Sequence, residues 1–434
     1  MPELVTLLIQ IVIILAAARV LGWAFRAIRQ PQVIGEMVAG ILLGPSLLGW
    51  LAPGVSGALF PPTSLSLLNA LSQVGLIVFM FLVGLEFNQQ NLKGKQHTAV
   101  VTSHASIIAP FFLGSVLALY LYPKLSDDSV KFTHFALFMG TAMSITAFPV
   151  LARILRERNL MRTPLGAMAI SCAAVDDISA WSILAGVVLL VRSSSSALPL
   201  WLALLLVIVF VGIMLFGVRP LARRLEVAYH KRGTITQDML ALILLLIMVS
   251  ALITELLGMH ALIGAFLAGV IMPKTDDFVR ALLGKLEYVC VVLLLPLFFA
   301  YTGLRTSVGL VHGGEMWFYC ALICAVAILG KFGGATLAAR SSGTPWREAA
   351  ALGVLMNTRG LIELVVLNIG LDIGVISPAL FAMLVLMALL TTFMTTPLLD
   401  WIYRPQVVHL RERVPAYEGG TMRAQHVESS IDAA

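Results

Sequence analysis

The sequence contains few charged residues. Asp, Glu, Lys and Arg make up 12% of its 434 residues, whereas a typical soluble domain has about 25%. Hydrophobic residues make up 59%, and apolar runs of about 20 residues, each long enough to cross roughly 30 Å of hydrocarbon, recur along the chain. This composition excludes an ordinary soluble domain and predicts an all-α, polytopic membrane protein.

Cysteine is also scarce, and the usual signatures of cofactor sites are missing. The four cysteines fall inside apolar runs, without Cys-x-x-Cys spacing or a nearby histidine cluster, so no resident metal or other cofactor is expected. No G-x-x-x-x-G-K-[ST] loop occurs, which argues against ATP hydrolysis and, with the absence of other catalytic motifs, against an enzyme. The net charge of +6 comes from basic residues in short loops, so it does not indicate nucleic acid.

Thirteen apolar segments are predicted to span the membrane. Their approximate ranges are 3–25, 32–50, 65–86, 98–121, 132–152, 164–191, 198–218, 236–256, 258–272, 286–304, 315–339, 347–371 and 376–401. If the N-terminus lies outside, most of the 29 lysines and arginines fall in inner loops, and the outer loops hold only Lys124, Lys131, Arg192 and Arg305. The positive-inside rule therefore predicts an outer N-terminus and a cytoplasmic C-terminus, with 402–434 as a short cytoplasmic tail.

Two motifs occur twice in the same order. Ile34–Gly40 (IGEMVAG) resembles Ile263–Gly269 (IGAFLAG), and Phe79–Leu85 (FMFLVGL) resembles Phe298–Leu304 (FFAYTGL). The copies lie seven predicted spans apart. Because seven is odd, the two copies run in opposite directions, which predicts the inverted repeat of secondary transporters. A simpler alternative is that glycine and alanine at four-residue spacing only mark tight helix packing.

The predicted repeats cover about 3–191 and 236–401, and the span at 198–218 is the linker between them. Spans 132–152 and 347–371 then correspond, and both contain helix breakers and polar side chains at mid-membrane depth. These residues are Ser144, Thr146 and Pro149 in the first span, and Asn357 and Thr358 in the second. Unwound backbone in a membrane is tolerated only where it lines a cavity, so both spans are predicted to be broken and to bind an ion. A simple proline kink is the alternative.

Asp176 and Asp177 lie at the centre of the apolar run Gly166–Leu190. A charge in the middle of a membrane helix costs at least about 2.5 to 3.5 kcal/mol, so this acidic pair is predicted to be functional. Adjacent residues point about 100° apart around a helix, and the two carboxylates are therefore expected to have different partners. We expect a monovalent metal cation and a proton to compete for this pair.

Three other ionisable residues within predicted spans are candidate site residues. Lys331 is expected to form an ion pair with an aspartate, although snorkelling of its side chain to the inner surface is an alternative. Arg359 and Glu363 lie four residues apart, so they can pair with each other on one face of a helix. They are candidates either for a supporting role on the ion path or for a purely structural role.

Eight motifs in a fixed order resemble one family of transporters. They are VIGEMVAGILLGPSLLG, FLVGLEF, SITAFPVLARIL, AAVDDISAW, GMHALIGAFLAGVIMP, PLFFAYTGL, LGKFGG and NTRGLIELVVLNIG. Over about residues 20 to 400 the chain resembles the monovalent cation:proton antiporter-2 (CPA2) family, and it is most similar to the plant cation/H+ exchangers and their bacterial relatives. The resemblance implies a sodium/proton antiporter-like fold, a homodimer, and a core domain that contains two crossed, broken helices and moves as an elevator.

The resemblance also assigns roles to the ionisable residues. Asp177 matches the carboxylate that binds the ion, Asp176 matches the acidic residue that pairs with the membrane lysine Lys331, and Thr146 matches the unwound crossing. Many potassium-transporting members have Asn-Asp or Gln-Asp where this chain has Asp-Asp, whereas an acidic pair with a lysine is more similar to electrogenic sodium exchangers. The identity of the cation therefore stays open at this point.

The sequence thus predicts a secondary antiporter of a bacterial inner membrane that exchanges Na+ or K+ for H+ in pH and cation homeostasis. Its partners are the transported ions, membrane lipid and a second copy of the chain. Two alternatives are a gated monovalent cation channel and an ion-binding sensor without coupled exchange. A symporter of an organic solute is a third.

Overall fold

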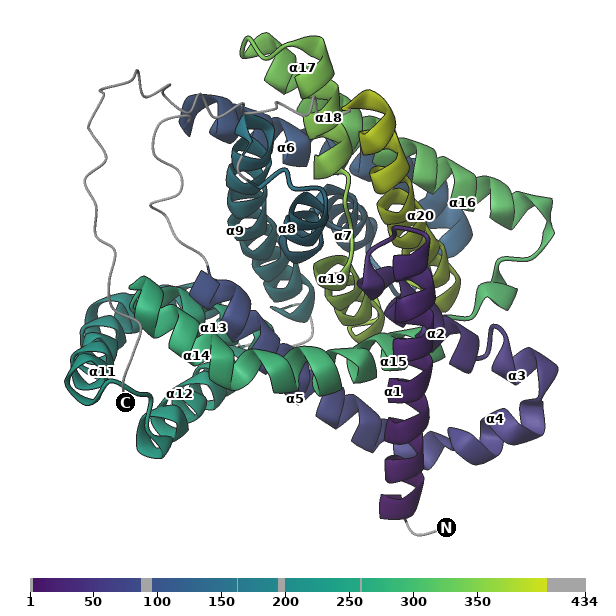
Figure 1. The fold of residues 1–434 in the computed structure, drawn as a ribbon. Helices are drawn as coiled ribbons and strands as arrows, with labels where there is room; N and C mark the ends of the chain where they lie inside the picture. The colour runs from purple at the N-terminus through teal and green to yellow at the C-terminus, as the bar shows by residue number, and fades with distance from the viewer. Residues whose placement is uncertain (1–2, 87–95, 162, 194–199, 258–259, 404–434) are drawn as a thin grey trace, which may run out of the picture. The chain divides into compact units, whose positions relative to one another are not determined.

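The computed structural model describes residues 3–86, 96–161, 163–193, 200–257 and 260–403. All regular structure among these residues is helical, as predicted (Figure 1). Nearly all of the predicted cytoplasmic tail, from residue 404 onward, lies outside the described residues.

The described residues up to Arg232 form eleven α-helices. They are α1 (Glu3–Ala27), α2 (Gln32–Leu43), α3 (Leu48–Leu51), α4 (Pro53–Leu59), α5 (Pro62–Glu86), α6 (Gln96–Leu125), α7 (Phe132–Ser144), α8 (Phe148–Glu157), α9 (Pro164–Ser193), α10 (Leu200–Gly212) and α11 (Arg219–Arg232). The π-helical turn η2 (Ile213–Val218) joins α10 to α11. This long helical stretch includes the described part, 200–218, of the predicted linker span.

The second half begins at α12. Its α-helices are α12 (Gln237–Leu256), α13 (Ala261–Ile271), α14 (Asp276–Val289), α15 (Leu295–Arg305), α16 (Gly313–Ile328), α17 (Gly334–Ser341), α18 (Trp346–Met356), α19 (Leu361–Asp372) and α20 (Pro378–Ile402). Two further π-helical turns, η3 (Cys290–Leu294) and η5 (Leu329–Gly333), and a 3-10 turn, η4 (Val308–Leu310), connect some of them.

The number of helical stretches long and apolar enough to cross a membrane is smaller than the predicted number of spans. Among the described residues there are ten, or eleven if the pair α18 and α19, bent by 43°, counts as one span. The two remaining predicted spans fail this test for physical reasons. Span 132–152 is divided between α7 and α8. In the described part of span 258–272 the helix is α13, whose 11 residues reach about 16 Å.

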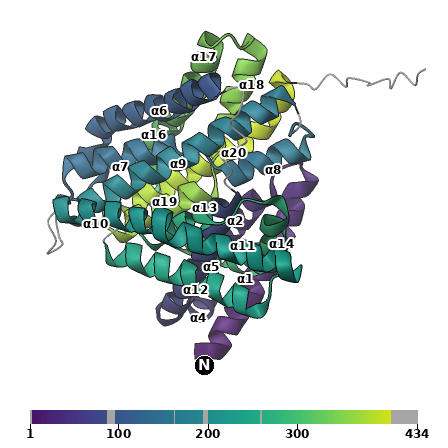
Figure 2. The ribbon, with the colours of Figure 1, turned by 90° about the vertical axis from the view of Figure 1, so that its left-hand side faces the viewer.

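Most of the described helices gather into two groups. One group, named here the core bundle, consists of α6–α9 and α16–α20, and the other, named the scaffold, consists of α1–α5 and α12–α15. Figures 1 and 2 both show α6–α9 and α16–α20 together, and the helices within each group make many contacts with one another. Chain segments far apart in sequence therefore share one bundle.

The repeated glycine motifs pack the scaffold together. A Cβ atom at Gly40 on α2 would lie 2.4 Å from the carbonyl oxygen of Phe299 on α15, and one at Gly269 on α13 would lie 2.1 Å from that of Phe81 on α5. Only glycine lets the backbones approach so closely. Each helix of the first repeated motif thus crosses a helix of the second motif from the other half, so the contacts repeat as the sequences do.

Different side-chain groups make the hydrogen bonds at the ends of the two helix crossings. After Pro45, the Ser46 hydroxyl donates to the Thr306 carbonyl at 2.6 Å and so joins the end of α2 to the end of α15. After Pro273, the Lys274 Nζ donates to the carbonyls of Gly84 and Leu85 on α5, at 2.7 and 2.8 Å. It also donates to a carbonyl of α13 at 2.9 Å. The Ser46 hydroxyl thus links the helices at one crossing, and the Lys274 amino group links them at the other.

Candidate functional site

Two interrupted helices cross inside the core bundle. α7 ends at Ser144 and α8 begins at Phe148, while α18 ends at Met356 and α19 begins at Leu361. Both spans are therefore broken, as predicted. The two interruptions touch each other through the backbone, because the Ala147 N–H donates to the Thr358 carbonyl at 2.9 Å.

The predicted breaker residues occupy different parts of these interruptions. Thr146 and Thr358 lie in the non-helical segments, and Asn357 lies in the turn that ends α18. Ser144 is the last residue of α7, and Pro149 lies in the first turn of α8 rather than in the unwound segment. Proline fits there because the first N–H groups of a helix have no intrahelical partner.

Asp176 is completely buried and fully hydrogen-bonded. Its Oδ2 atom accepts from Lys331 at 2.9 Å and from the Thr146 hydroxyl at 2.7 Å. Two serines of α6 complete the set: Ser103 donates to Oδ1, and Ser106 lies 3.2 Å from Oδ1 and 3.0 Å from Oδ2. The carboxylate therefore has donors from four different positions, which is the environment that an ionised carboxylate requires in a protein interior.

Lys331 bridges this carboxylate and the break in α7. The lysine is buried on the π-helical turn η5, and its Nζ donates both to Asp176 and to the carbonyl of Ser144. The structure thus places Lys331 in an ion pair rather than at a wet span end, where snorkelling would put it. π-helical turns are often found at functional sites, because the extra residue redirects a side chain.

Asp177 differs sharply from its neighbour. It is 4% exposed, and its Oδ1 atom is buried without a hydrogen-bond partner among the described residues. The amide oxygen of Asn357, beside the other break, is in the same condition. A buried carboxylate without a partner is unfavourable unless its charge is neutralised. A proton or a bound cation would each supply that neutralisation.

Arg359 and Glu363 form a second buried ion pair, at 3.0 Å between Nη1 and Oε2. The arginine also donates to the carbonyls of Ala142 at 2.8 Å and Met143 at 2.6 Å. These two carbonyls directly precede the one that accepts from the buried lysine, so two cations hold the negative end of the α7 dipole. This geometry favours a structural role for the pair, one of the two alternatives left open by the sequence.

Ser103 and Ser106 were not predicted as site residues. Both belong to the predicted span 98–121 and lie three residues apart, which places them on one face of α6. This three-residue spacing is the only feature of the sequence that points to the two serines as a pair. Serine and threonine are common in membrane helices, where they bond their own backbone, so such spacing alone does not identify a site.

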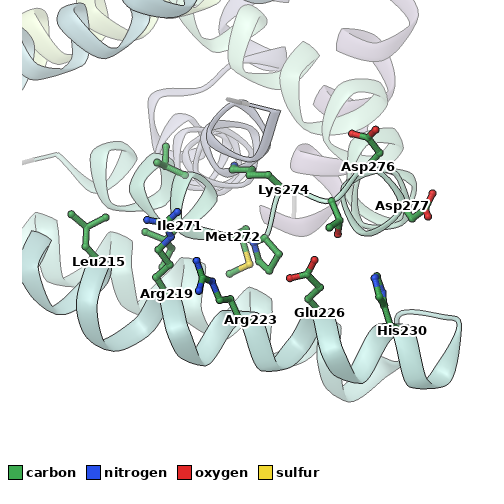
Figure 3. A pocket seen from close by; sticks show the side chains of 13 residues that line it. Leu215, Arg219, Arg223, Glu226, His230, Ile271, Met272, Lys274, Asp276 and Asp277 are labelled. Carbon is green, nitrogen blue, oxygen red and sulfur yellow. The ribbon is translucent and has the colours of Figure 1, made fainter. Parts of the chain in front are cut away.

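A separate pocket of about 770 Å³ lies between α11 and the segment that joins α13 to α14. In Figure 3, Arg219, Arg223, Glu226 and His230 rise from α11 toward this segment, which carries Lys274. Asp276 and Asp277 also line the pocket.

Burial, with a smaller contribution from Arg219, lowers the pKa of Lys274 to about 7. The ammonium form has one donor for each of the three carbonyl partners, and loss of the proton above this pKa leaves two donors for three acceptors.

The lowered pKa of Lys274 predicts a pH-dependent stability. Between about pH 7 and about 10.5 the unfolded chain holds this proton and the folded chain does not, so stability rises with pH across that window. We expect the Tm of the wild type in detergent to rise relative to that of Lys274→Met between about pH 6.5 and 9. Lys285→Met, at an exposed position of α14, should follow the wild type. A constant difference in Tm between wild type and Lys274→Met would contradict this.

The combination of crossed helix breaks with a buried carboxylate pair and lysine defines an ion-transporting membrane protein. The family model described as "Sodium/hydrogen exchanger, transmembrane" matches residues 12–402. This chain therefore belongs to the sodium/hydrogen exchanger family, and the resemblance to cation/H+ antiporters of the CPA2 branch is confirmed.

Individual relatives support this assignment. The chain is 45% identical over 403 residues to the "Na(+)/H(+) antiporter NhaS4" of Synechocystis sp., covering 92% of this chain and 98% of that protein. It is 42% identical over 399 residues to "Cation/H(+) antiporter 17" of Arabidopsis thaliana, and it spans 48% of that longer protein. The solved structure of the sodium proton antiporter MjNhaP1 from Methanocaldococcus jannaschii has the same fold. The TM-score is 0.62 at 15% identity, covering 92% of this chain and 96% of that one.

Proposed function

We propose that the chain is a secondary antiporter that exchanges a monovalent cation for a proton by alternating access, with Asp177 as the group for which the two compete. It is a transporter and not an enzyme. The observation that carries this proposal is the contrast within the acidic pair. Asp176 accepts hydrogen bonds on both oxygens, whereas Oδ1 of Asp177 is buried and has no partner among the described residues.

The exchange cycle follows from that contrast. On one side of the membrane Asp177 releases its proton and binds a cation, with help from Asp176 and from backbone oxygens at the crossing. The core bundle then shifts against the scaffold, and the cation leaves on the other side as a proton returns. A buried carboxylate is neutralised by one partner or the other, so proton and cation exclude each other and transport is coupled.

Several finer features belong to the same proposal. The transported cation is Na+ or K+, and the protein works as a homodimer in a bacterial inner membrane. The N-terminus faces outward and the C-terminus inward, as the distribution of basic residues favours. Apolar side chains such as Val12 and Phe216 are 65% and 84% exposed, and contact with lipid or a second copy would cover such side chains. Residues 3–191 and 236–401 act as the two inverted halves.

The purified protein in vesicles tests the proposal directly. Adding Na+ or K+ outside acid-loaded vesicles should release protons from the lumen, with a rate that saturates with cation concentration. Repeating the measurement with each alkali cation gives the selectivity. Unitary currents that ignore the proton gradient would instead favour a channel, and cation binding without any flux would favour a sensor.

A further inference from the structure

An ion pair joins the scaffold to the core bundle at the end of α15. Nη2 of Arg305, the last residue of this scaffold helix, lies 2.7 Å from Oδ1 of Asp372, the last residue of the core helix α19. The Nη1 atom of Arg305 donates to Oδ1 of Asn368 on α19 at 3.1 Å. Nδ2 of Asn368 in turn donates to the Thr302 hydroxyl of α15 at 2.9 Å. Each of these three bonds has one partner in the scaffold and one in the core bundle.

Two other contacts between the scaffold and the core bundle involve neutral side chains. The Gln30 amide, just before α2, donates to the carbonyl of Phe393 on α20 at 3.1 Å. Trp181 on α9 stacks on Phe266 of α13, with ring centroids 6.3 Å apart. A hydrogen bond between neutral groups is weaker than one between charged groups, and apolar contact has no preferred direction. The ion pair is therefore the contact among these three that resists a shift most strongly.

α19 connects this ion pair to the crossing of the two broken helices. The helix begins at Leu361, directly after the break, and its 12 residues reach about 18 Å to Asp372. At the break, the Thr358 carbonyl accepts from the Ala147 N–H. Because a helix of this length moves as one piece, a shift of the crossing relative to the scaffold moves Asp372 relative to Arg305.

We propose that Arg305, Asn368 and Asp372 form a latch that holds the core bundle against the scaffold in this conformation and must open in every exchange cycle. The inference rests on the proposed exchange function and deepens it. Hydrogen bonds weaken steeply outside a narrow range of distance and angle, so the three bonds break when the bundle shifts. The latch thus stabilises one end state of the cycle, and its strength sets the fraction of protein in that state.

A reversible crosslink across the latch tests whether it opens. In a variant with Arg305→Cys and Asp372→Cys, a short bis-methanethiosulfonate reagent joins the two thiols in detergent, and the protein is then placed in vesicles. The reagent can reach these positions, whose native side chains are 22% and 42% exposed, whereas the four native cysteines are buried. Proton release on addition of Na+ or K+ should fall to the level of protein-free vesicles, and it should return when a reducing agent cleaves the crosslink.

Arg280→Cys with Asp277→Cys is the matched control. The native side chains also form an ion pair at 2.7 Å, but both belong to α14 in the scaffold, so this crosslink should leave proton release unaltered. If the variant with Arg305→Cys and Asp372→Cys does not fold, Arg305→Cys with Asn368→Cys replaces it, since Asn368 accepts from the same guanidinium.

Charge reversal tests whether the ion pair itself holds the latch closed. Asp372→Arg places a second cation beside Arg305, and the backbone amides at the end of α19 should then exchange hydrogen with solvent about fivefold faster. Combining Asp372→Arg with Arg305→Asp restores opposite charges and should restore the wild-type rate of hydrogen exchange. Equal rates in the wild type and Asp372→Arg would overturn the role of the ion pair.

The vesicle measurements separate failure of the latch from failure of the proposed function. Undiminished proton release in the crosslinked variant would overturn the latch while leaving the antiporter intact. Loss of proton release in the folded variant before crosslinking would also overturn it. Absence of cation-driven proton release in the wild type would overturn both proposals.

Discussion

Asp177→Asn is expected to reduce cation/H+ exchange to the level of protein-free vesicles. The amide has nearly the same shape as the carboxylate, but it can neither release a proton nor neutralise a cation, so the step at which the two compete is lost. The fold should persist, because the substitution removes a buried charge that has an unpartnered oxygen rather than a bonded group. The measurement is proton release on addition of cation, alongside the Tm in detergent.

A second carboxylate serves as the control. Asp238→Asn changes an exposed side chain in the first turn of α12 and should leave exchange unaltered. Exchange that survives in Asp177→Asn at a rate comparable with the wild type would move the competing site elsewhere. The adjacent Asp176 would then be the next candidate.

Arg359→Met is expected to destabilise the protein strongly, by about 3 to 5 kcal/mol, the usual cost of removing one partner of a buried ion pair. The substitution leaves Glu363 as a buried carboxylate without its cation, and it removes the donors of the Ala142 and Met143 carbonyls at the end of α7. The measurement is the Tm in detergent, together with the yield of monodisperse protein.

Two variants separate the charge effect from the loss of packing. Arg359→Met combined with Glu363→Gln removes both charges, and it should regain a large part of the lost Tm because no isolated charge remains. Arg280→Met breaks the exposed pair with Asp277, whose side chains are more than two-thirds exposed, and exposed pairs contribute only about 0.2 to 1 kcal/mol. Equal losses of Tm in Arg359→Met and Arg280→Met would show that burial of the first pair has no energetic importance.

The features that could be predicted from the sequence are those that are costly in lipid. Charged residues such as Asp176, Asp177 and Lys331 stand out because nothing in a bilayer favours them. The breaks near Thr146 and Thr358 stand out for a similar reason, since an unwound backbone in lipid needs partners. The family resemblance added the expected crossing of the two breaks.

Other features of the site and the fold could not be predicted, because the local sequence patterns that accompany them also occur in many membrane helices without these features. Ser103 and Ser106 are small, neutral hydroxyl residues, and only the packing of α6 on α9 shows that they contact Asp176. Hydropathy alone also does not give the length of the helix within a span. Fewer continuous helices than predicted spans are long enough to cross a membrane, because span 132–152 is divided at its predicted break and α13, the described helix of span 258–272, has 11 residues.

The contacts made by Ser46 and Lys274 at the two crossings also show what the repeated motifs do not duplicate. Backbone geometry is repeated at both crossings, but Ser46 and Lys274 carry different acid–base chemistry. A hydroxyl keeps its proton at any physiological pH, whereas an amine with a pKa near 7 gains or loses one. The two crossings, alike in their close backbone packing, therefore differ in their response to acidity.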